Sequence, residues 1–314
     1  MRHGRRPSPR RRTALRLLLP AVLLPAVLAG AGAPAARAVE PPPASPSAAG
    51  HPSTTSPAVP PPDTTAPAPA GPEADRVGAL FVGGFGPGHH FCTAGVVPSP
   101  LGNLLLTAAH CVRSPEGVTF APGYRDGVAP YGSWPVVRVF ATEGWTGRRD
   151  PDQDFAFLQV AEDGAGRRIQ SVVGANPIAV LTPFTGSVRL YGYGSRADYP
   201  LLCTNVTTRF ALRQRRIHCP AYPGGTSGGP WVDTATGAVV GVIGGYQLGG
   251  DTPDISYSAY FDAVFARLYL DARFAASVAP GTLRPPLAGL PTGPHPNPRA
   301  TAPYGSWAGG GRLR

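Results

Sequence analysis

The sequence predicts an all-β domain, either a barrel or a sandwich, over roughly residues 77–258. Two observations support this fold class. Short apolar and β-branched runs follow one another at close spacing, and turns rich in Gly and Pro separate them, a pattern typical of barrels and sandwiches. One pattern of helical periodicity comes after the last of these runs, so we expect the β domain to end with a single helix.

The strand signals fall into two sets. The first set lies between residues 77 and 160 and comprises Ala79–Val82, Phe91–Val97, Leu104–Thr107, Val118–Ala121, Trp134–Phe140 and Phe155–Val160. The second set lies between residues 178 and 258 and comprises Ile178–Leu181, Ser187–Tyr193, Leu201–Val206, Arg216–Cys219, Pro230–Val232, Ala238–Ile243 and Asp254–Ser258.

The predicted helix covers about residues 259–274. Its apolar positions are spaced i, i+3, i+4, i+7 and i+8, which places them on one face: Phe261, Val264, Phe265, Leu268 and Tyr269. We expect Ser258 to be the N-cap and Asp262 to lie in the first turn. The helix is interpreted as a packing element that closes the domain.

Both ends of the chain have compositions that do not favour a packed core. Residues 1–38 combine a basic start, an apolar run too short to span a bilayer and Ala36-Arg37-Ala38, and this layout predicts a signal peptide cleaved after Ala38. Arg11-Arg12 leaves a twin-arginine export signal open as an alternative to the general secretory route. We therefore expect a secreted, extracellular protein with no stable membrane association after cleavage.

Two low-complexity segments flank the predicted domain of residues 76–282. Residues 39–75 are rich in Pro, Ala, Ser and Thr, and residues 283–314 in Pro and Gly, so we expect a disordered linker or propeptide and a disordered tail. The tail contains Ala302–Trp307, an identical copy of Ala129–Trp134 inside the domain. A tail that docks by mimicking the internal copy is one interpretation of this repeat.

The net charge of +10 does not indicate a nucleic-acid partner, because much of it comes from the predicted signal peptide. Eight of the 28 basic residues lie in residues 1–38, which contain no Asp or Glu, so the remaining 20 nearly balance the 18 acidic residues. A mature chain close to neutral has no basic surface of the kind that nucleic-acid binding requires. We expect no nucleic-acid partner.

Three segments carry the side chains of a nucleophilic hydrolase. The glycine-rich run of residues 224–230 places Ser227 in a tight turn, Leu104–Thr107 delivers His110, and Asp154 precedes the apolar run that begins at Phe155. A serine hydroxyl becomes nucleophilic when an imidazole accepts its proton, and a carboxylate fixes the imidazole tautomer. Asp150 and Asp152 are rivals for the carboxylate role, but only Asp154 adjoins the apolar run.

These motifs resemble those of the trypsin/chymotrypsin-like serine peptidases. TAAHC at residues 107–111, DFAFL at 154–158 and GTSGGP at 225–230 stand in the order in which that family carries its histidine, aspartate and serine. The resemblance covers residues 77–275 and also extends to the glutamyl endopeptidases. It implies two antiparallel β-barrels, at about 77–165 and 175–258, with the active cleft between them.

The resemblance further implies an oxyanion hole and a mode of maturation. Matched to the family, the backbone N–H groups of Gly225 and Ser227 form the oxyanion hole. Family members use a new N-terminus that pairs with an aspartate just before the nucleophile, but Thr226 occupies that position here. Cleavage after Arg76 remains open, and we expect no switching through that ion pair.

Four cysteines in an exported chain indicate two disulfides, for which three pairings exist. The resemblance matches Cys92–Cys111 to the family bridge beneath the histidine, which leaves Cys203 to pair with Cys219. No close Cys-x-x-Cys pair is present, so we expect no metal. We also expect no cofactor.

The resemblance places the substrate pocket at Ala221, Gly244, Gly245 and Tyr246. Ala221 stands six residues before Ser227, where a trypsin-like pocket carries a charge, so we expect P1 not to be Lys or Arg. The glutamyl endopeptidases usually carry a histidine on the far pocket wall, and none occurs at residues 242–246.

The function implied is a secreted serine endopeptidase that acts on polypeptides through an acyl-enzyme, as a monomer. Two alternatives stay open. A protein with the same fold could bind peptides or cell-wall material without catalysis, and an esterase could use the same three groups.

Overall fold

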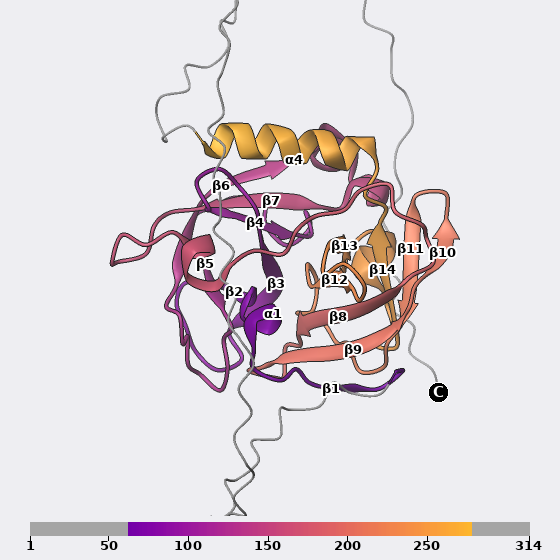
Figure 1. Cartoon of the computed structure of the whole chain (residues 1–314), viewed down its shortest axis with the longest axis horizontal. Helices are drawn as coiled ribbons and strands as arrows, with labels where there is room; N and C mark the ends of the chain where they lie inside the picture. Colours follow the sequence, from indigo (N-terminus) through magenta and orange to yellow (C-terminus); the bar gives the residue numbers. More distant parts are fainter. Residues whose placement is uncertain (1–61, 278–314) are drawn as a thin grey trace, which may run out of the picture. The chain divides into compact units, whose positions relative to one another are not determined.

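The computed structural model describes residues 62–277, and the first half of this range forms a closed six-stranded barrel (Figure 1). Its neighbouring strands are antiparallel, and the barrel closes in the order β2-β3-β4-β7-β6-β5. The strands are β2 (Val77–Val82), β3 (His90–Val97), β4 (Leu104–Thr107), β5 (Val118–Pro122), β6 (Trp134–Ala141) and β7 (Ala156–Val160).

The apolar run of β7 is continuous because both of its faces are covered. Leu158 packs inside the barrel with Phe120 and Trp134. Phe157 points the other way and stacks on Tyr269, with ring centroids 5.1 Å apart. Tyr269 belongs to the C-terminal helix α4 (Ala263–Ala276), which lies along β6 and β7 in Figure 1. Period-2 alternation thus assigns successive β7 residues to two different apolar clusters.

The second half, together with β1 from the N-terminal segment, forms two antiparallel sheets. The larger has the order β1-β9-β8-β12-β13, and the smaller has the order β10-β11-β14. Their strands are β1 (Thr65–Pro67), β8 (Ser187–Tyr193), β9 (Pro200–Val206), β10 (Thr208–Ala211), β11 (Gln214–His218), β12 (Pro230–Asp233), β13 (Val239–Val242) and β14 (Ile255–Ala259). Short helical segments complete the described part: α1 (Pro72–Asp75), α2 (Glu143–Arg148), the 3₁₀ turn η1 (Pro151–Gln153), α3 (Ile169–Val173) and the 3₁₀ turn η2 (Tyr246–Gly249).

The second predicted barrel is not closed by backbone ladders alone. Between β13 and β14, the Val242 N–H donates to the Ser258 hydroxyl at 3.0 Å, where a ladder would use a carbonyl. Between β9 and β11, the Cys203–Cys219 disulfide and a hydrogen bond from Asn205 Nδ2 to the His218 carbonyl join the strands. Side chains therefore complete the connection between the two sheets.

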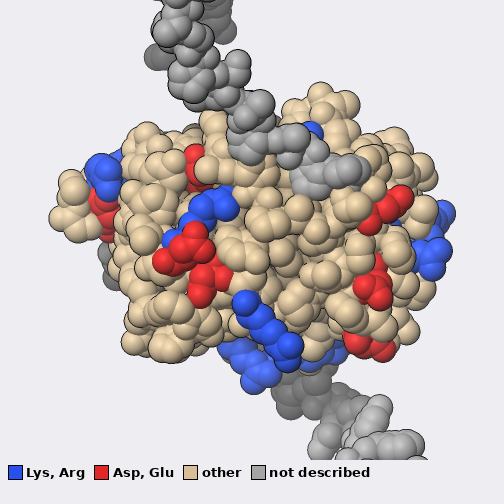
Figure 2. All heavy atoms as spheres, turned by 90° about the horizontal axis from the view of Figure 1, so that it is seen from below, with Lys and Arg blue, Asp and Glu red and all other residues tan. Residues whose placement is uncertain are grey.

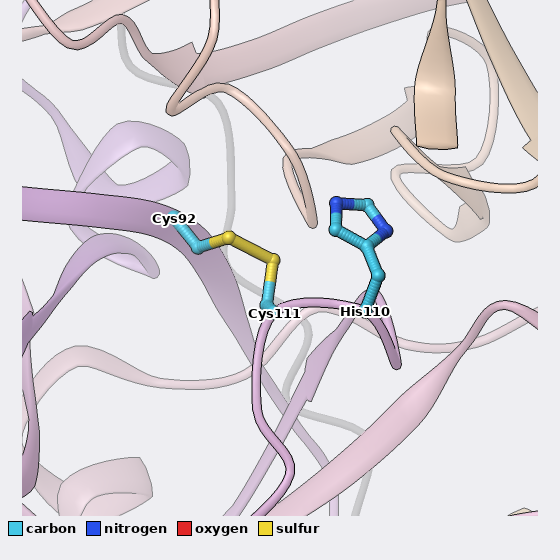
Figure 3. A group of neighbouring side chains, drawn as sticks. All are labelled: Cys92, His110 and Cys111. Atoms are coloured by element: carbon cyan, nitrogen blue, oxygen red, sulfur yellow. A yellow bond between two sulfur atoms is a disulfide. The ribbon is translucent and has the colours of Figure 1, made fainter. Parts of the chain in front are cut away.

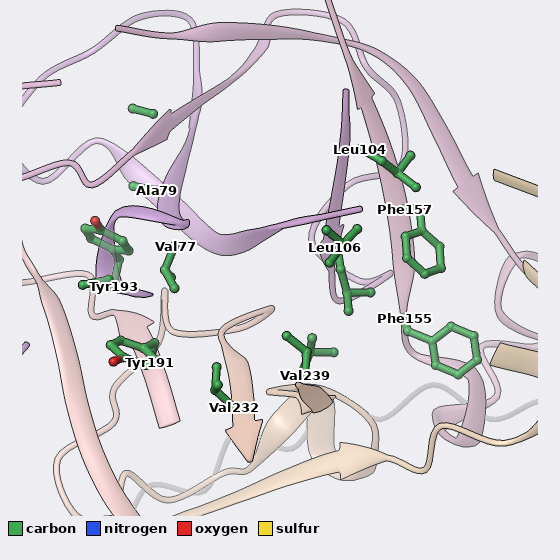
Figure 4. Close-up of a cluster of buried hydrophobic side chains, with 14 of the residues drawn as sticks. Val77, Ala79, Leu104, Leu106, Phe155, Phe157, Tyr191, Tyr193, Val232 and Val239 are labelled. Carbon is green, nitrogen blue, oxygen red and sulfur yellow. The ribbon is translucent and has the colours of Figure 1, made fainter. Parts of the chain in front are cut away.

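Apolar side chains from both halves meet in one buried cluster, which Figure 4 shows. Leu106 and Phe155 come from the barrel and its edge, and Val232 and Val239 come from the larger sheet of the second half. Tyr193 also reaches across, because its hydroxyl donates to the Tyr124 carbonyl at 2.9 Å. The two halves thus share a core, and this core positions the segments that lie between them.

In the second half one strand prediction was wrong, and one strand was not predicted. Ile178–Leu181 forms only an isolated bridge between Ile178 and Val239, because Leu181 has a left-handed φ of 56° that interrupts an extended run. Strand β10 was missed because all four of its residues are exposed, so it has no alternation of apolar and polar side chains.

The predicted start of the folded domain was also wrong. Residues 65–75 are ordered and not part of a linker: β1 pairs with β9, and α1 follows it. Glu73 of α1 accepts hydrogen bonds from Arg189 Nε at 2.5 Å and from Arg189 Nη2 at 2.7 Å. The Pro, Ala and Thr composition of this segment concealed its order, because contacts with distant strands hold it.

The predicted helix exists, but its cap differs from the prediction. Asp262 is the N-cap, and its Oδ1 accepts from the N–H groups of Val264 and Phe265. Ser258 lies in β14, where its hydroxyl serves the strand contact described above. Helix α4 therefore begins four residues later than the predicted start at 259.

Charged side chains of both signs are interspersed among uncharged ones on the face that Figure 2 shows. Within residues 62–277, no helix has the length and apolar character needed to cross a bilayer. The predicted signal peptide, most of the linker, the tail and its hexapeptide copy lie outside the described residues.

Candidate active site

His110 and Asp154 are in direct contact. His110 lies just after β4, with 15% of its side chain exposed, and its Nδ1 is 2.7 Å from Oδ2 of Asp154. The backbone N–H of His110 donates to Oδ1 of the same carboxylate at 2.9 Å. These two contacts fix both the ring and its backbone, and they assign the Nδ1 proton to the carboxylate side, which leaves Nε2 as the proton acceptor.

The Asp154 side chain is fully buried, and hydrogen bonds compensate for its burial. Besides the two donors on His110, the Gly245 N–H donates to Oδ2 at 2.8 Å. The rival carboxylates are engaged elsewhere. Asp150 caps η1 through Asp152 N–H, and Asp152 accepts from Gln214 Nε2 at 2.7 Å. Of the three, only Asp154 contacts the histidine.

Ser227 lies in a turn that glycines make possible. Gly225 has φ +94° and Gly228 has φ +80°, values that favour residues without a Cβ. A Cβ at Gly225 would also lie 2.8 Å from the Tyr193 carbonyl oxygen, so the turn packs closely against β8. Ser227 itself is half-buried.

Thr93 of β3 anchors this turn to the first barrel. Its backbone N–H donates to the Ser227 carbonyl at 2.8 Å, and its hydroxyl donates to the Gly225 carbonyl at 3.2 Å. The hydroxyl also accepts from the Tyr193 N–H at 2.8 Å. Sequence reasoning missed Thr93, because a threonine in a predicted strand carries no signal of such a role.

The turn that carries Ser227 packs against the segment that carries His110, since a Cβ at Gly228 would lie 3.0 Å from the backbone N of Ala108. In the described part, no hydrogen bond joins Ser227 Oγ to the imidazole, and the N–H groups of Gly225 and Ser227 donate to no protein acceptor. Contacts of this kind are often long before substrate is bound. Both N–H groups are thus available to an external acceptor.

Both expected disulfides are formed. Cys92–Cys111 has Cα atoms 6.1 Å apart and lies beside the segment that carries His110 (Figure 3). Cys203–Cys219 has Cα atoms 5.9 Å apart and ties β9 to the segment leading toward Ser227. The sulfur atoms of Cys92 and Cys111 lie near the His110 ring, but both are bonded in the disulfide.

A pocket of about 500 Å³ opens beside Ser227, and we call it the Ser227 pocket. Its buried lining is uncharged and includes Tyr222, Thr226, Ile243, Gly249 and Ser256, whereas Arg196 and Asp251 line it from exposed positions. None of the four predicted pocket residues, Ala221, Gly244, Gly245 and Tyr246, lines it.

The backbone explains why these residues do not line the Ser227 pocket. Ala221 is exposed with φ +62°, and Gly244 packs against Asp154, behind the site. The wall is formed instead by η2 and the loop after it, residues 248–253.

The fold and the motifs agree with the known proteins that this chain resembles. Residues 92–242 match the family described as "Trypsin-like peptidase domain". The chain therefore carries a trypsin-like serine peptidase domain. By this assignment it is a serine endopeptidase, a hydrolase.

Solved structures of bacterial and other serine peptidases share the fold. The thermostable serine protease AL20 from an extremophilic microorganism is 26% identical, with a TM-score of 0.56, and the match covers 66% of this chain and 99% of that one. Protease Anisep from Arthrobacter nicotinovorans is 24% identical, with a TM-score of 0.55 and coverage of 65% and 97%. A Glu endopeptidase is 21% identical, with a TM-score of 0.55 and coverage of 68% and 97%. Among curated protein sequences, none matches this chain.

Thr226 occupies the position where the family resemblance would place an aspartate that pairs with a new N-terminus. Thr226 is buried, and its hydroxyl donates to the Pro223 carbonyl at 2.8 Å. Val77 is the first residue of β2, and the Arg76 carbonyl before it accepts from the Val96 N–H at 2.8 Å. The chain is therefore held on both sides of the Arg76–Val77 bond.

Proposed function

We propose that the protein is a secreted endopeptidase that hydrolyses peptide bonds with a triad of Ser227, His110 and Asp154. Ser227 Oγ attacks the substrate carbonyl carbon while His110 Nε2 takes its proton. The imidazolium then gives that proton to the leaving amine, and the acyl-enzyme forms. Water, deprotonated by the same imidazole, releases the acyl group and returns the proton to Ser227.

The observation that carries the proposal is the 2.7 Å contact between the buried Asp154 carboxylate and His110 Nδ1. A carboxylate without water contact stabilises the imidazolium that forms during the attack, and it keeps Nε2 free of its proton beforehand. A histidine that served only packing would not need three donors converging on one buried acid.

The same turn offers an oxyanion hole. The N–H groups of Gly225 and Ser227 have no protein acceptor in the described part of the chain, and the positive φ of Gly225 turns its peptide in a way that a side chain would hinder. Each such donor stabilises the tetrahedral intermediate by roughly 3–4 kcal/mol. We assign both groups to the substrate oxygen.

Secretion and specificity complete the proposal. Two disulfides favour an oxidising compartment, in line with the predicted signal peptide of residues 1–38. An uncharged buried lining in the Ser227 pocket favours an uncharged P1 side chain over Lys or Arg.

A pair of serine variants tests the proposal. We expect Ser227→Ala to lower kcat for an unstructured polypeptide by about 10⁶-fold, because both the nucleophile and its covalent intermediate are lost. Ser114→Ala is the matched control, since Ser114 is exposed and its hydroxyl accepts only a long bond of 3.4 Å from Glu116 N–H. Retained hydrolysis by folded Ser227→Ala protein would contradict the triad.

A further inference from the structure

A second open space borders His110, and two arginines line it. We call this space the arginine hollow: about 460 Å³, lined by His110, Arg113, Trp145, Arg149, Pro151, Gly245, Gln247 and Leu248. A smaller space of about 310 Å³ adjoins it and shares Arg113, Trp145 and Arg149. Leu248 also lines the Ser227 pocket, so the two sites are neighbours along the region between Ser227 and His110.

The charge of the arginine hollow is one-sided. No Asp or Glu lines either of its two spaces, whereas the Ser227 pocket is lined by one arginine and one aspartate. Within residues 62–277, neither the Arg113 nor the Arg149 guanidinium has an ion pair or a hydrogen bond. Both positive charges are therefore uncompensated beside the candidate catalytic histidine.

The backbone and an aromatic ring hold Arg149 in place. It is the C-cap of α2 with a left-handed φ of 54°, and its N–H donates to the Trp145 carbonyl at 2.9 Å. Its guanidinium lies 5.1 Å from the centre of the Trp145 ring, which is only 4% exposed. Stacking on an aromatic face orients a guanidinium and leaves its N–H edge free to bind a carboxylate.

The carboxylates near the hollow already have other partners. Asp150 accepts from Asp152 N–H and Gln153 Nε2, Asp152 accepts from Gln214 Nε2, and Asp154 holds His110. These three carboxylates are engaged in the hydrogen bonds just given, and none of them lines either space.

We propose that the arginine hollow binds an acidic side chain of the substrate, Asp or Glu, at the residue next to the one held in the Ser227 pocket. This inference rests on the proposed function. The substrate carboxylate takes the free N–H edges of Arg149 and Arg113. A peptide chain crossing both sites would thus present an uncharged side chain to one and a carboxylate to the other.

Paired peptides test the inference. Each pair carries Glu or the uncharged isostere Gln, either at the residue before P1 or at the first residue after the scissile bond, and kcat/KM is measured for both members. For one of the two positions we expect kcat/KM to be roughly tenfold higher for the Glu peptide than for the Gln peptide at low salt. This Glu-to-Gln ratio should fall toward one at high ionic strength. Arg113→Gln and Arg149→Gln should each lower the ratio about threefold.

Three further variants make the test specific. Arg149→Lys should lower the Glu-to-Gln ratio less than Arg149→Gln does, because the charge remains although the N–H edge is lost. Arg148→Gln should leave it unchanged, since Arg148 is exposed on the same helix and lines neither space. Affinities of the same peptides for the Ser227→Ala variant give the comparison without catalysis. Hydrolysis retained by this variant together with a Glu preference in binding would contradict the triad and support the hollow, whereas hydrolysis lost without any Glu preference in binding would support the triad and contradict the hollow. Equal values for Glu and Gln at both positions, or a preference insensitive to both arginine variants, would overturn the inference.

Discussion

Asp154 determines the geometry of the candidate site at the scale of single residues. Two N–H groups from distant segments, those of His110 and Gly245, converge on its buried carboxylate together with the His110 ring. The residue thus joins the end of β4 to the segment after β13. Removing its charge should change the tautomer of His110 and leave the surrounding backbone contacts largely in place.

We expect Asp154→Asn to lower kcat by about 10⁴-fold, because the amide would hydrogen-bond to the wrong imidazole tautomer. Asp152→Asn is the matched control two residues earlier. It should change kcat by only a few fold, since Asp152 contacts Gln214 and not the histidine. Steady-state kinetics on one peptide decides the matter, and similar losses for the two variants would exclude the assigned role of Asp154.

Sequence reasoning could propose Ser227, His110 and Asp154 because the signal for each of them is local. TAAHC, DFAFL and GTSGGP each place one reactive side chain beside an apolar strand or a glycine turn, and that arrangement is written in consecutive residues. Thr93 and the walls of the Ser227 pocket were not predictable in this way. Their roles depend on which strands and loops of the two halves are in contact, and a short stretch of sequence does not predict contacts between distant segments.

At the scale of elements, His90 of β3 supports the loop that borders the Ser227 pocket. Its Nε2 lies 3.1 Å from the Ala197 carbonyl, and Ser195 and Arg196 of the same loop line the pocket. Burial lowers the pKa of His90, while the Ala197 carbonyl and the Asp198 carboxylate act in the opposite direction. A neutral imidazole therefore donates to the loop and links it to the first barrel.

The lowered pKa of His90 predicts how stability depends on pH. Above the ordinary value of 6.5 the histidine is neutral in both states, so it adds no dependence. Below that value the unfolded chain binds a proton at His90 and the folded domain does not. The free energy of unfolding therefore decreases as the pH is lowered, until the pH reaches the pKa of His90 in the folded domain. The slope from one such group is at most about 1.4 kcal/mol per pH unit.

Chemical denaturation of the wild type and of His90→Gln at pH 7.5 and pH 5 measures this contribution. The variant should lose less stability than the wild type between the two pH values, whatever its stability at pH 7.5. The same decrease in both proteins would show that His90 does not titrate as described.

At the scale of the whole described domain, side-chain hydrogen bonds join segments that are far apart in the sequence. Thr93 and Asp154 connect them beside Ser227 and His110, and Glu73 of α1 binds Arg189 of β8 at the N-terminal segment. Composition could predict the many strands and the closing helix. It could not predict that β1 pairs with β9 or that Ser258 bridges β13 and β14, because these contacts join segments more than 15 residues apart.

Identification of the residue that a fluorophosphonate modifies tests the central claim most directly. The folded wild-type domain is labelled, digested and mapped by mass spectrometry, because the reagent forms a stable adduct only with a serine that a neighbouring base activates. The account predicts one adduct, on Ser227, and none when His110 is replaced by Ala. An adduct on a different serine, or equal labelling of Ser227 without His110, would contradict it.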